Sequence, residues 1–403
     1  MKKKTKAILI SQFFWPESFP INTIIKNFKE IEFTIITAKP NYPHGSIFKN
    51  YKKFGLIKEN FYSHKIYHIP ILPRGSAGSF NLFMNYFSFI FSALFYGTIH
   101  LKKNKYDLIF VYNTSPITQI LIGYYFKLLF RIKLVTWVQD IWPESVSATN
   151  HLSENFIFKI FRKFCHYLYS VNDLLILQSK HFFKYFKKNK INKKKIYIPN
   201  SSNLNFISIK SKKHKLINKF KFNFVYAGNI GLAQDFKNFE VFLEKLYKEN
   251  KNIKFHLIGS GSYKNILIKK IKQKKILNVE IYPYIKNKFL YHYLRDADVL
   301  FLSLKDSYVF NLTIPSKLQN YLFCKKPILG WANGATKQII EKAKCGIVIK
   351  PGNINNLVKA CLKLSEKKYL KKLSKNSEIF YKKNFELKFI KKKLLNSLLN
   401  IIK

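Results

Sequence analysis

Short runs of apolar, mostly β-branched residues alternate with longer amphipathic stretches along most of the chain. In the first half these runs predict buried parallel strands at residues 7–10, 33–37, 108–112 and 134–138. In the second half they predict strands at residues 223–226, 254–258, 279–282, 299–303, 327–330 and 346–349. Strands that alternate with helices are typical of doubly wound parallel sheets, so we expect an α/β fold with two Rossmann-like domains.

A lysine-rich polar stretch with little hydrophobic periodicity separates the two series of predicted strands. We therefore expect an N-terminal domain over residues 1–203, a linker over 204–220 and a C-terminal domain over 221–385. Lysine-rich helical patterns follow, and the last of them, residues 386–403, is expected to return to the N-terminal domain.

Residues 80–99 form an uncharged apolar stretch that is long enough to cross a membrane. Asn81, Asn85, Ser88 and Ser92 recur three or four residues apart, which places a narrow polar stripe on one face of a helix. The stretch also lies between predicted strands of one sheet, where a membrane span would split the domain. Three interpretations of residues 80–99 remain: a core or interdomain helix, which is favoured, a helix lying on a membrane surface, and a true membrane span.

The formal net charge of +51 is extreme, but only four of the 72 basic residues are arginine. Nucleic-acid surfaces usually use arginine for bidentate contacts, so the lysine excess favours a compositional bias, and we expect no nucleic-acid partner. The charge would still attract anionic membranes and anionic substrates. The four cysteines form no C-x-x-C pair, which suits a reducing cytosol.

Three segments of the C-terminal half could bind a diphosphate. Gly228, Asn229 and Gly231 follow one predicted strand, and Gly259 and Gly261 follow the next; glycines there let the backbone approach a phosphate. Pro315, Ser316 and Lys317 begin a predicted helix, whose N-terminus carries partial positive charge. Ordinary turns and an exposed lysine would explain the same residues taken singly.

In the N-terminal half, Asp140, Trp142 and Glu144 follow a predicted strand, and their side chains suit sugar binding. They could equally serve packing and the helix dipole. Asp296 and Asp298 spell the D-x-D sequence of metal-dependent transferases, but they precede a strand and lack an acidic cluster, so we expect no metal site.

The chain resembles family 4 glycosyltransferases of the GT-B fold, and among them the WbuB-like sugar transferases of bacterial surface-polysaccharide synthesis. The resemblance covers nearly the whole chain. It rests on FWPE at 14–17, PNYPHG at 40–45, DIWPES at 140–145, YAGNIGLAQ at 226–234, IPSK at 314–317 and KPIL at 326–329.

The resemblance implies two domains facing each other across a cleft, and retaining transfer of a hexosyl or N-acetylhexosaminyl group from a nucleotide sugar. The donor is expected to be a UDP-sugar, with no metal and no other cofactor. The acceptor would be a lipid-linked saccharide or glycan of the O-antigen or capsule type (lipopolysaccharide), and the enzyme would lie peripherally on the cytoplasmic face of the plasma membrane. Catalytic roles would fall to Asp140, Glu144 and Lys317.

The resemblance also divides the binding residues between the domains. The donor would contact Gly228, Asn229, Gly231, Gly259, Gly261, Pro315, Ser316, Lys317 and Asn320. The acceptor would contact Pro16, Glu17, Asn41, Tyr42 and Trp142.

The chain departs from the family pattern at several positions. The two glutamates of many members fall at Leu312 and Asn320, and the usual arginine and lysine near Asn229 and Gln234, which makes Lys317 the leading phosphate ligand. The catalytic histidine of some relatives falls at Asn113 or Thr114, so no general base is assigned. Two alternatives remain: a nucleotide-sugar epimerase of the same fold, and a non-enzymatic basic protein that binds membrane or nucleic acid.

Overall fold

The computed structural model describes residues 4–75, 78–150, 155–204 and 221–402. The chain divides into two compact units. Unit 1 contains residues 1–146, 152–199 and 387–403, and unit 2 contains residues 147–151 and 200–386. The linker expected at 204–220 lies outside the described residues except for Leu204.

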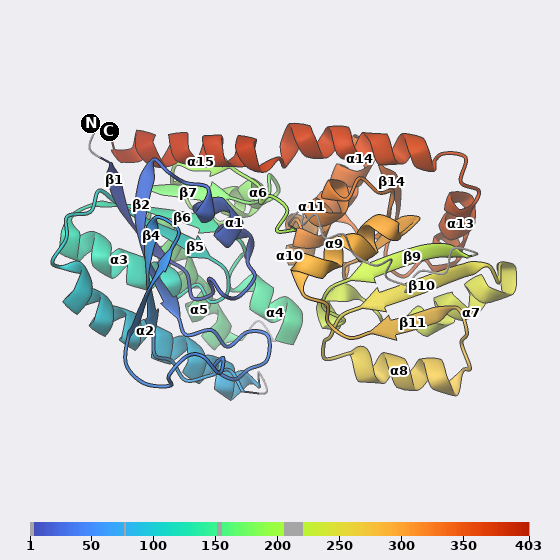
Figure 1. The fold of residues 1–403 in the computed structure, drawn as a ribbon, viewed down its shortest axis with the longest axis horizontal. Helices are drawn as coiled ribbons and strands as arrows, with labels where there is room; N and C mark the ends of the chain where they lie inside the picture. Colours follow the sequence, from blue (N-terminus) through green and yellow to red (C-terminus); the bar gives the residue numbers. More distant parts are fainter. Residues whose placement is uncertain (1–3, 76–77, 151–154, 205–220, 403) are drawn as a thin grey trace. The chain divides into compact units, whose positions relative to one another are not determined.

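Unit 1 is built on an eight-stranded sheet in the order β3-β4-β2-β1-β5-β6-β7-β8 (Figure 1). Its strands are β1 (Thr5–Ile10), β2 (Ile31–Ala38), β3 (Ile57–Phe61), β4 (His64–Ile69), β5 (Leu108–Asn113), β6 (Lys133–Val138), β7 (Leu174–Leu177) and β8 (Lys195–Tyr197). All neighbouring strands are parallel except β3 and β4, which pair antiparallel. The parallel strands therefore end at one common edge, where the residues of interest follow them.

Helices cover both faces of this sheet. They are α1 (Pro20–Lys26), α2 (Ser79–Leu101), α3 (Gln119–Phe130), α5 (Phe156–Ser170), α6 (Phe182–Lys188) and α15 (Leu387–Ile402), and α4 (Glu144–Asn150) spans the boundary between the units. On one face, α15 buries Ile390, Leu394 and Leu398 in the same apolar cluster as α1, so the last helix packs within unit 1.

The other face of the sheet is covered closely by α2 and α3. Gly97 of α2 lies where a Cβ would meet Phe126 of α3 and Ile36 of β2. Gly123 of α3 lies where a Cβ would meet Val111 of β5. Glycine at these two helical positions lets both helices approach their neighbours.

Unit 2 contains a six-stranded, all-parallel sheet in the order β11-β10-β9-β12-β13-β14. Its strands are β9 (Phe222–Ala227), β10 (Ile253–Ile258), β11 (Val279–Tyr282), β12 (Val299–Ser303), β13 (Ile328–Trp331) and β14 (Gly346–Ile349). Every strand predicted from the apolar runs of the sequence is present, in both units.

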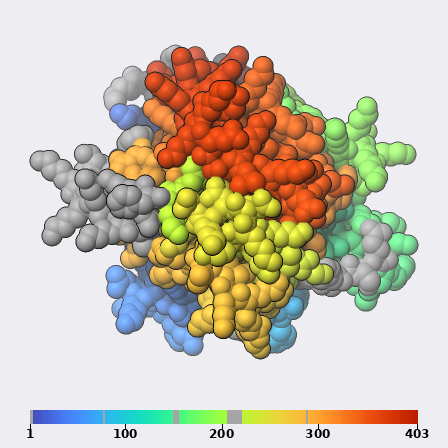
Figure 2. Space-filling model, turned by 90° about the vertical axis from the view of Figure 1, so that its right-hand side faces the viewer, coloured from blue at the N-terminus to red at the C-terminus, as the bar shows by residue number. Residues whose placement is uncertain are grey.

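The helices of unit 2 also lie on both faces of its sheet. They are the short 3-10 helix η1 (Leu232–Gln234), α7 (Phe239–Glu249), α8 (Lys264–Gln273), α9 (Asn287–Asp296), α10 (Tyr308–Leu312), α11 (Ser316–Phe323), α12 (Gly334–Ala343), α13 (Ile354–Ser365) and α14 (Leu370–Asn384). Figure 2 shows an outer face of this unit, on which α7 in yellow lies beside α13 in red and α8 below it. Two apolar clusters, one on each side of the sheet, form its core.

Candidate functional site

The two predicted glycine loops lie against each other at the carboxyl edge of the sheet in unit 2. The backbone N–H of Gly228 donates to Ile258 O at 2.9 Å, and that of Ile230 donates to Ser260 O at 2.8 Å. Gly259 has φ +155°, and a Cβ there would lie 1.9 Å from Gly228 O. Because no other residue fits that space and conformation, glycine permits the contact that joins the loops.

Helix α11 begins beside the first glycine loop. Tyr321 fixes the helix, because its hydroxyl accepts from Ala227 N at 3.0 Å and donates to Phe301 O at 3.1 Å. Lys317, in the first turn, passes Gly228 so closely that a Cβ there would lie 2.2 Å from Lys317 Cε. The three segments predicted to bind a diphosphate therefore converge.

The Lys317 ammonium has unusual surroundings. Its Nζ donates to Tyr226 Oη at 2.7 Å and lies 4.6 Å from the centre of that ring. The Tyr226 hydroxyl in turn donates to Asn229 O. Among the described residues no carboxylate pairs with this ammonium, and burial lowers the pKa of Lys317 to about 7. A cation enclosed without a counter-ion is prepared to receive an anionic ligand.

Asn229 and Gln234, near which the resemblance placed an arginine and a lysine, bond to each other in this structure. Gln234 Oε1 accepts from Gly231 N and from Asn229 Nδ2, both at 3.3 Å, which closes the first loop. A second cation that the sequence did not single out lies at the other loop: Lys264 Nζ donates to Gly259 O at 2.9 Å and to Tyr282 O at 3.1 Å.

The remaining predicted donor residues lie around the start of α11. Pro315 precedes the first turn, and Ser316 is exposed there. Asn320 lies one turn further, where its Oδ1 accepts from Ser202 Oγ at 2.8 Å and from Asn203 N at 3.2 Å. These bonds fix the segment that enters unit 2, so only the amide nitrogen of Asn320 is left to bind a ligand.

The D-x-D pair lies at the opposite edge of this sheet. Asp298 precedes β12 and accepts from Asn223 N, at the start of β9, at 2.8 Å. Asp296 pairs with its neighbour Arg295. Within the described parts of the chain, no three His, Cys, Asp or Glu side chains gather where they could hold a metal ion.

In unit 1, Glu17 holds the loop that contains Asn41 and Tyr42. Its Oε1 accepts from the backbone N–H of Asn41 at 2.8 Å and of Tyr42 at 2.7 Å. Burial outweighs these bonds and raises the pKa of Glu17 to about 7. Asn41 is fully buried, whereas Tyr42 is 42% exposed and can meet a ligand. Pro16 precedes Glu17 and is partly exposed.

Arg74 and Tyr86 join this group, although the sequence did not point to them. The Arg74 guanidinium lies 5.2 Å from the centre of the Tyr42 ring, and its charge opposes the rise in the pKa of Glu17. The charges of both Arg74 and Asp140 act on the Tyr86 hydroxyl, whose pKa burial raises. Tyr86 is the single residue of α2 in this group, and it brings that helix close to the site.

Asp140 and Trp142 share a partner in Ser115, which follows β5. The Ser115 hydroxyl and backbone N–H both donate to the Asp140 carboxylate, while burial raises the pKa of Asp140 to about 6. Trp142 Nε1 donates to Ser115 Oγ at 3.2 Å. The carboxylate is therefore ionised at neutral pH and held in a fixed position.

Glu144 has partners on both oxygens. Oε1 lies 3.0 Å from Arg162 Nε, and Oε2 accepts from Tyr185 Oη at 2.7 Å. These bonds tie α4 to α5 and α6. They favour a positioning role for Glu144 over contact with a substrate.

Asn113, the last residue of β5, is enclosed at the same edge of the sheet. Its side-chain amide is fully buried, and neither its oxygen nor its nitrogen has a partner among the described residues. Buried amides are almost always hydrogen-bonded, so this group suits a polar ligand such as a sugar hydroxyl.

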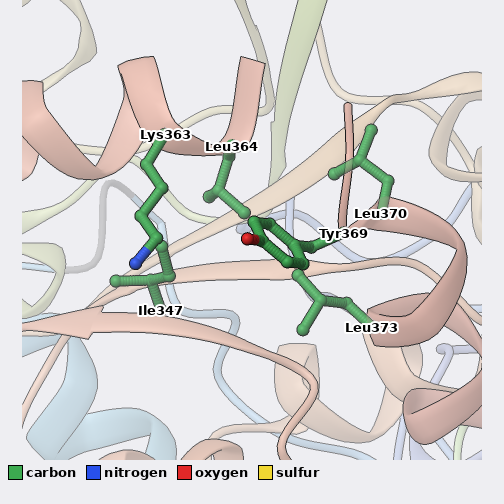
Figure 3. Close-up of a pocket in the computed structure, with 6 residues that line it drawn as sticks. All are labelled: Ile347, Lys363, Leu364, Tyr369, Leu370 and Leu373. Carbon is green, nitrogen blue, oxygen red and sulfur yellow. The ribbon is translucent and has the colours of Figure 1, made fainter. Parts of the chain in front are cut away.

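The hollow drawn in Figure 3 lies elsewhere in unit 2. It measures about 240 Å³ and lies between β14, the end of α13 and the start of α14. Its lining is mostly apolar, with Ile347, Leu364 and Leu370 among the side chains shown. Because α13 follows β14, its last turn reaches the edge opposite the glycine loops, and no predicted site residue lines this hollow.

Comparison with known proteins bears on both units. Residues 208–380 match the family described as "Glycosyl transferases group 1". No curated protein sequence matches the chain.

Solved structures match nearly the whole chain. Sucrose-phosphate synthase from Thermosynechococcus elongatus is 15% identical with a TM-score of 0.75, covering 99% of both chains. Anabaena Alr3699/HepE in complex with UDP is 12% identical with a TM-score of 0.69, covering 99% of this chain and 100% of that one. A glycosyltransferase from Rickettsia africae is 15% identical with a TM-score of 0.67, covering 99% of both chains.

At these identities the likeness shows the fold, which is GT-B, as the sequence predicted. Together with the family match over unit 2, it supports a glycosyltransferase of the GT-B type.

Proposed function

We propose that the chain is a retaining glycosyltransferase that moves a sugar from a UDP-sugar to a lipid-linked saccharide in bacterial surface-polysaccharide synthesis. The observation that carries the donor half is the buried Lys317 ammonium, which lies beside two joined glycine loops and pairs with no carboxylate in the part of the chain that the structure describes. The solved structures of Anabaena Alr3699/HepE with UDP and with UDP-glucose support the choice of nucleotide.

The main requirement of this reaction is that the negative charge developing on the leaving diphosphate be stabilised. Lys317 supplies one positive charge, and the N-terminus of α11 adds its dipole. Glycine at 228 lets the Lys317 side chain pass directly against the loop backbone, and glycine at 261 lets the two loops join, so the charge is held at the end of the sheet. Such fixed electrostatic stabilisation is usually the largest catalytic contribution, so we propose that no metal is needed.

The acceptor half of the proposal rests on unit 1. Tyr42, which is 42% exposed, offers aromatic surface to a sugar ring, and Asp140 offers a carboxylate for its hydroxyls. Trp142 and Glu17 are buried, so we propose that they position these residues and do not contact the sugar. With a pKa of about 6, Asp140 is ionised at neutral pH and can accept a hydrogen bond from the attacking hydroxyl. The Asn113 amide, for which the described ranges supply no hydrogen-bond partner, can bind a further hydroxyl of a bound sugar.

Calorimetry with UDP and the substitution Lys317→Met tests the donor half. The substitution keeps the length of the side chain and removes its charge. UDP affinity should fall at least tenfold, and equal affinity in the two proteins would remove the basis of the proposal. The nature of the product separates transfer from epimerisation, because an epimerase would release a free altered nucleotide sugar.

A further inference from the structure

Helix α2 turns two of the four polar side chains of its stripe, Asn85 and Ser88, toward the rest of unit 1. Asn85 is fully buried, where its Oδ1 accepts from Gln12 Nε2 at 2.7 Å and its Nδ2 donates to Leu72 O at 2.6 Å. Ser88 Oγ accepts from Leu72 N at 2.9 Å. The middle of the polar stripe therefore faces the protein, the reverse of a surface helix in water, whereas Asn81 at its start is exposed.

The outward face of α2 is apolar along its whole length. Its large exposed side chains, with exposed fractions from 45% to 73%, are Phe80, Phe83, Phe87, Phe91, Phe95 and Ile99. Phe83, Phe87 and Phe91 contact one another in sequence, with ring centres 5.8 and 4.5 Å apart. Their main contacts on this face are thus with each other and with solvent.

The apolar surface continues over α3 and α5. Thr98 Oγ1 of α2 lies 3.0 Å from Tyr125 Oη of α3, and Tyr124 Oη of α3 lies 3.4 Å from Tyr167 Oη of α5. Further large apolar side chains exposed on these two helices are Tyr125, Leu128, Leu129, Phe156, Ile157, Ile160, Phe164 and Tyr167. Contiguous apolar surface of this kind marks an interaction site.

The charges on these helices have one sign. Helices α2, α3 and α5 contain no aspartate or glutamate, whereas α5 carries exposed Lys159 and Lys163. Exposed Lys102, Lys103 and Lys105 follow the end of α2. Apolar side chains bordered by lysines are complementary to a surface that is anionic outside and apolar beneath, which is an anionic lipid bilayer.

We propose that the outer faces of α2, α3 and α5, here called the docking face, lie on an anionic membrane with their phenylalanines among the lipid chains. Helix α2 is long and apolar enough to cross a membrane, the only such helix in the described residues. It lies on the bilayer instead, because Asn85, Phe89, Ala93, Gly97 and Leu101 are buried within unit 1.

The docking face reaches the candidate acceptor site. Helix α2 contributes Tyr86, on which the charges of Arg74 and Asp140 act. An acceptor whose lipid stays in the bilayer would therefore need to extend only its sugar to reach these residues. This link rests on the proposed function, whereas docking itself does not.

Flotation with lipid vesicles tests docking directly. Vesicles of equal parts phosphatidylcholine and phosphatidylglycerol should carry the full chain upward, and vesicles of phosphatidylcholine alone should carry much less. The double variant Phe83→Ser, Phe91→Ser should bind the anionic vesicles roughly tenfold to a hundredfold more weakly, because each phenylalanine contributes apolar burial.

The matched control removes two exposed apolar side chains from unit 2, with Ile266→Ser and Leu277→Ser, and should bind vesicles like the parent protein. Equal loss in both double variants, or no loss in the first, would overturn the proposal. So would sedimentation showing a dimer that the first double variant dissociates, with no vesicle binding by either protein. UDP affinity measured in parallel separates a failure of docking from a failure of the proposed function.

Discussion

Lys317 gives the sharpest prediction, because its free and ligand-bound states should differ in protonation. Its pKa is lowered to about 7 by burial, so at pH 8 most molecules of the free protein hold a neutral amine there. A diphosphate next to the amine favours the charged form and raises its pKa. Binding of UDP at pH 8 should therefore take up close to one proton.

The size of the effect follows from the contacts. A hydrogen bond to a charged group contributes about 1.5–3 kcal/mol, and about 1.4 kcal/mol corresponds to a tenfold change in affinity. Lys317→Met should therefore weaken UDP binding by roughly 10- to 100-fold at pH 7. In the parent protein the affinity should fall as the pH rises above about 7, because the proton must then be supplied by the solvent.

Titration calorimetry in buffers with different ionisation enthalpies measures both quantities. Lys248→Met is the matched control, because it removes one charge from an exposed position on α7. It should leave the affinity and the proton uptake unchanged. Proton uptake that persists in Lys317→Met, or an affinity equal to that of the control, would refute the assignment.

Thermal unfolding without ligand tests whether Lys317→Met binds UDP weakly only because the variant is misfolded. The folded pKa of Lys317 is below the unfolded value of 10.5, so the parent's free energy of unfolding should rise with pH between about 7 and 10.5. Below pH 7 the folded protein bears the full cost of an enclosed charge. Lys317→Met removes that cost and should melt at the same or a higher temperature there. A much lower melting temperature would mean that weak UDP binding reflects misfolding.

Further predictions concern the acceptor side, the metal and the membrane. Asp140→Asn should leave UDP affinity unchanged but lower turnover by roughly 10²-fold or more, since a positioned acid or base contributes at least that much; unchanged turnover would remove Asp140 from the chemistry. The folded pKa of Glu17 is raised from 4.5 to about 7, so the free energy of unfolding should decrease as the pH rises from about 4.5 to 7. In thermal melts, Glu17→Gln should make the melting temperature less dependent on pH over that range. Activity should survive EDTA, and a loss that manganese restores would contradict a metal-independent reaction. Vesicle binding should weaken in 1 M salt, where the Debye length is about 3 Å, but a remainder held by the phenylalanines should persist.

Strand positions could be predicted from the sequence because buried parallel strands read as continuous apolar runs. β3 and β4 were not predicted, because Ile57–Phe61 has three polar residues at its centre and His64–Ile69 begins with two basic residues, so neither is a continuous apolar run. β8 is only three residues long. β7 was not predicted either, although Leu174–Leu177 is a continuous apolar run, so its pattern was present in the sequence and was overlooked.

The donor and acceptor halves of the candidate site also differ in how far their residues could be predicted from the sequence. Gly228, Gly259 and Lys317 could be found because a strand end and a helix start are local patterns. Arg74 and Ser115 could not, because their importance comes from contacts with residues far away in the chain.

The polar stripe of α2 was visible in the sequence, but its direction was not. Spacing alone tells which residues share a face, and it cannot tell whether that face meets protein or solvent. The bond between Gln12 and Asn85 turns the stripe inward, and that pairing joins segments 73 residues apart.

Transfer of label from a nucleotide sugar to a lipid tests the central claim most directly. The purified chain would be incubated with a panel of radiolabelled UDP-sugars and a bacterial membrane extract, and the products separated into lipid and aqueous fractions. The account predicts that label from one UDP-sugar moves into the lipid fraction, that EDTA does not prevent it and that Lys317→Met reduces it. Label that remains in the aqueous fraction as an altered nucleotide sugar, or no turnover with any donor, would contradict it.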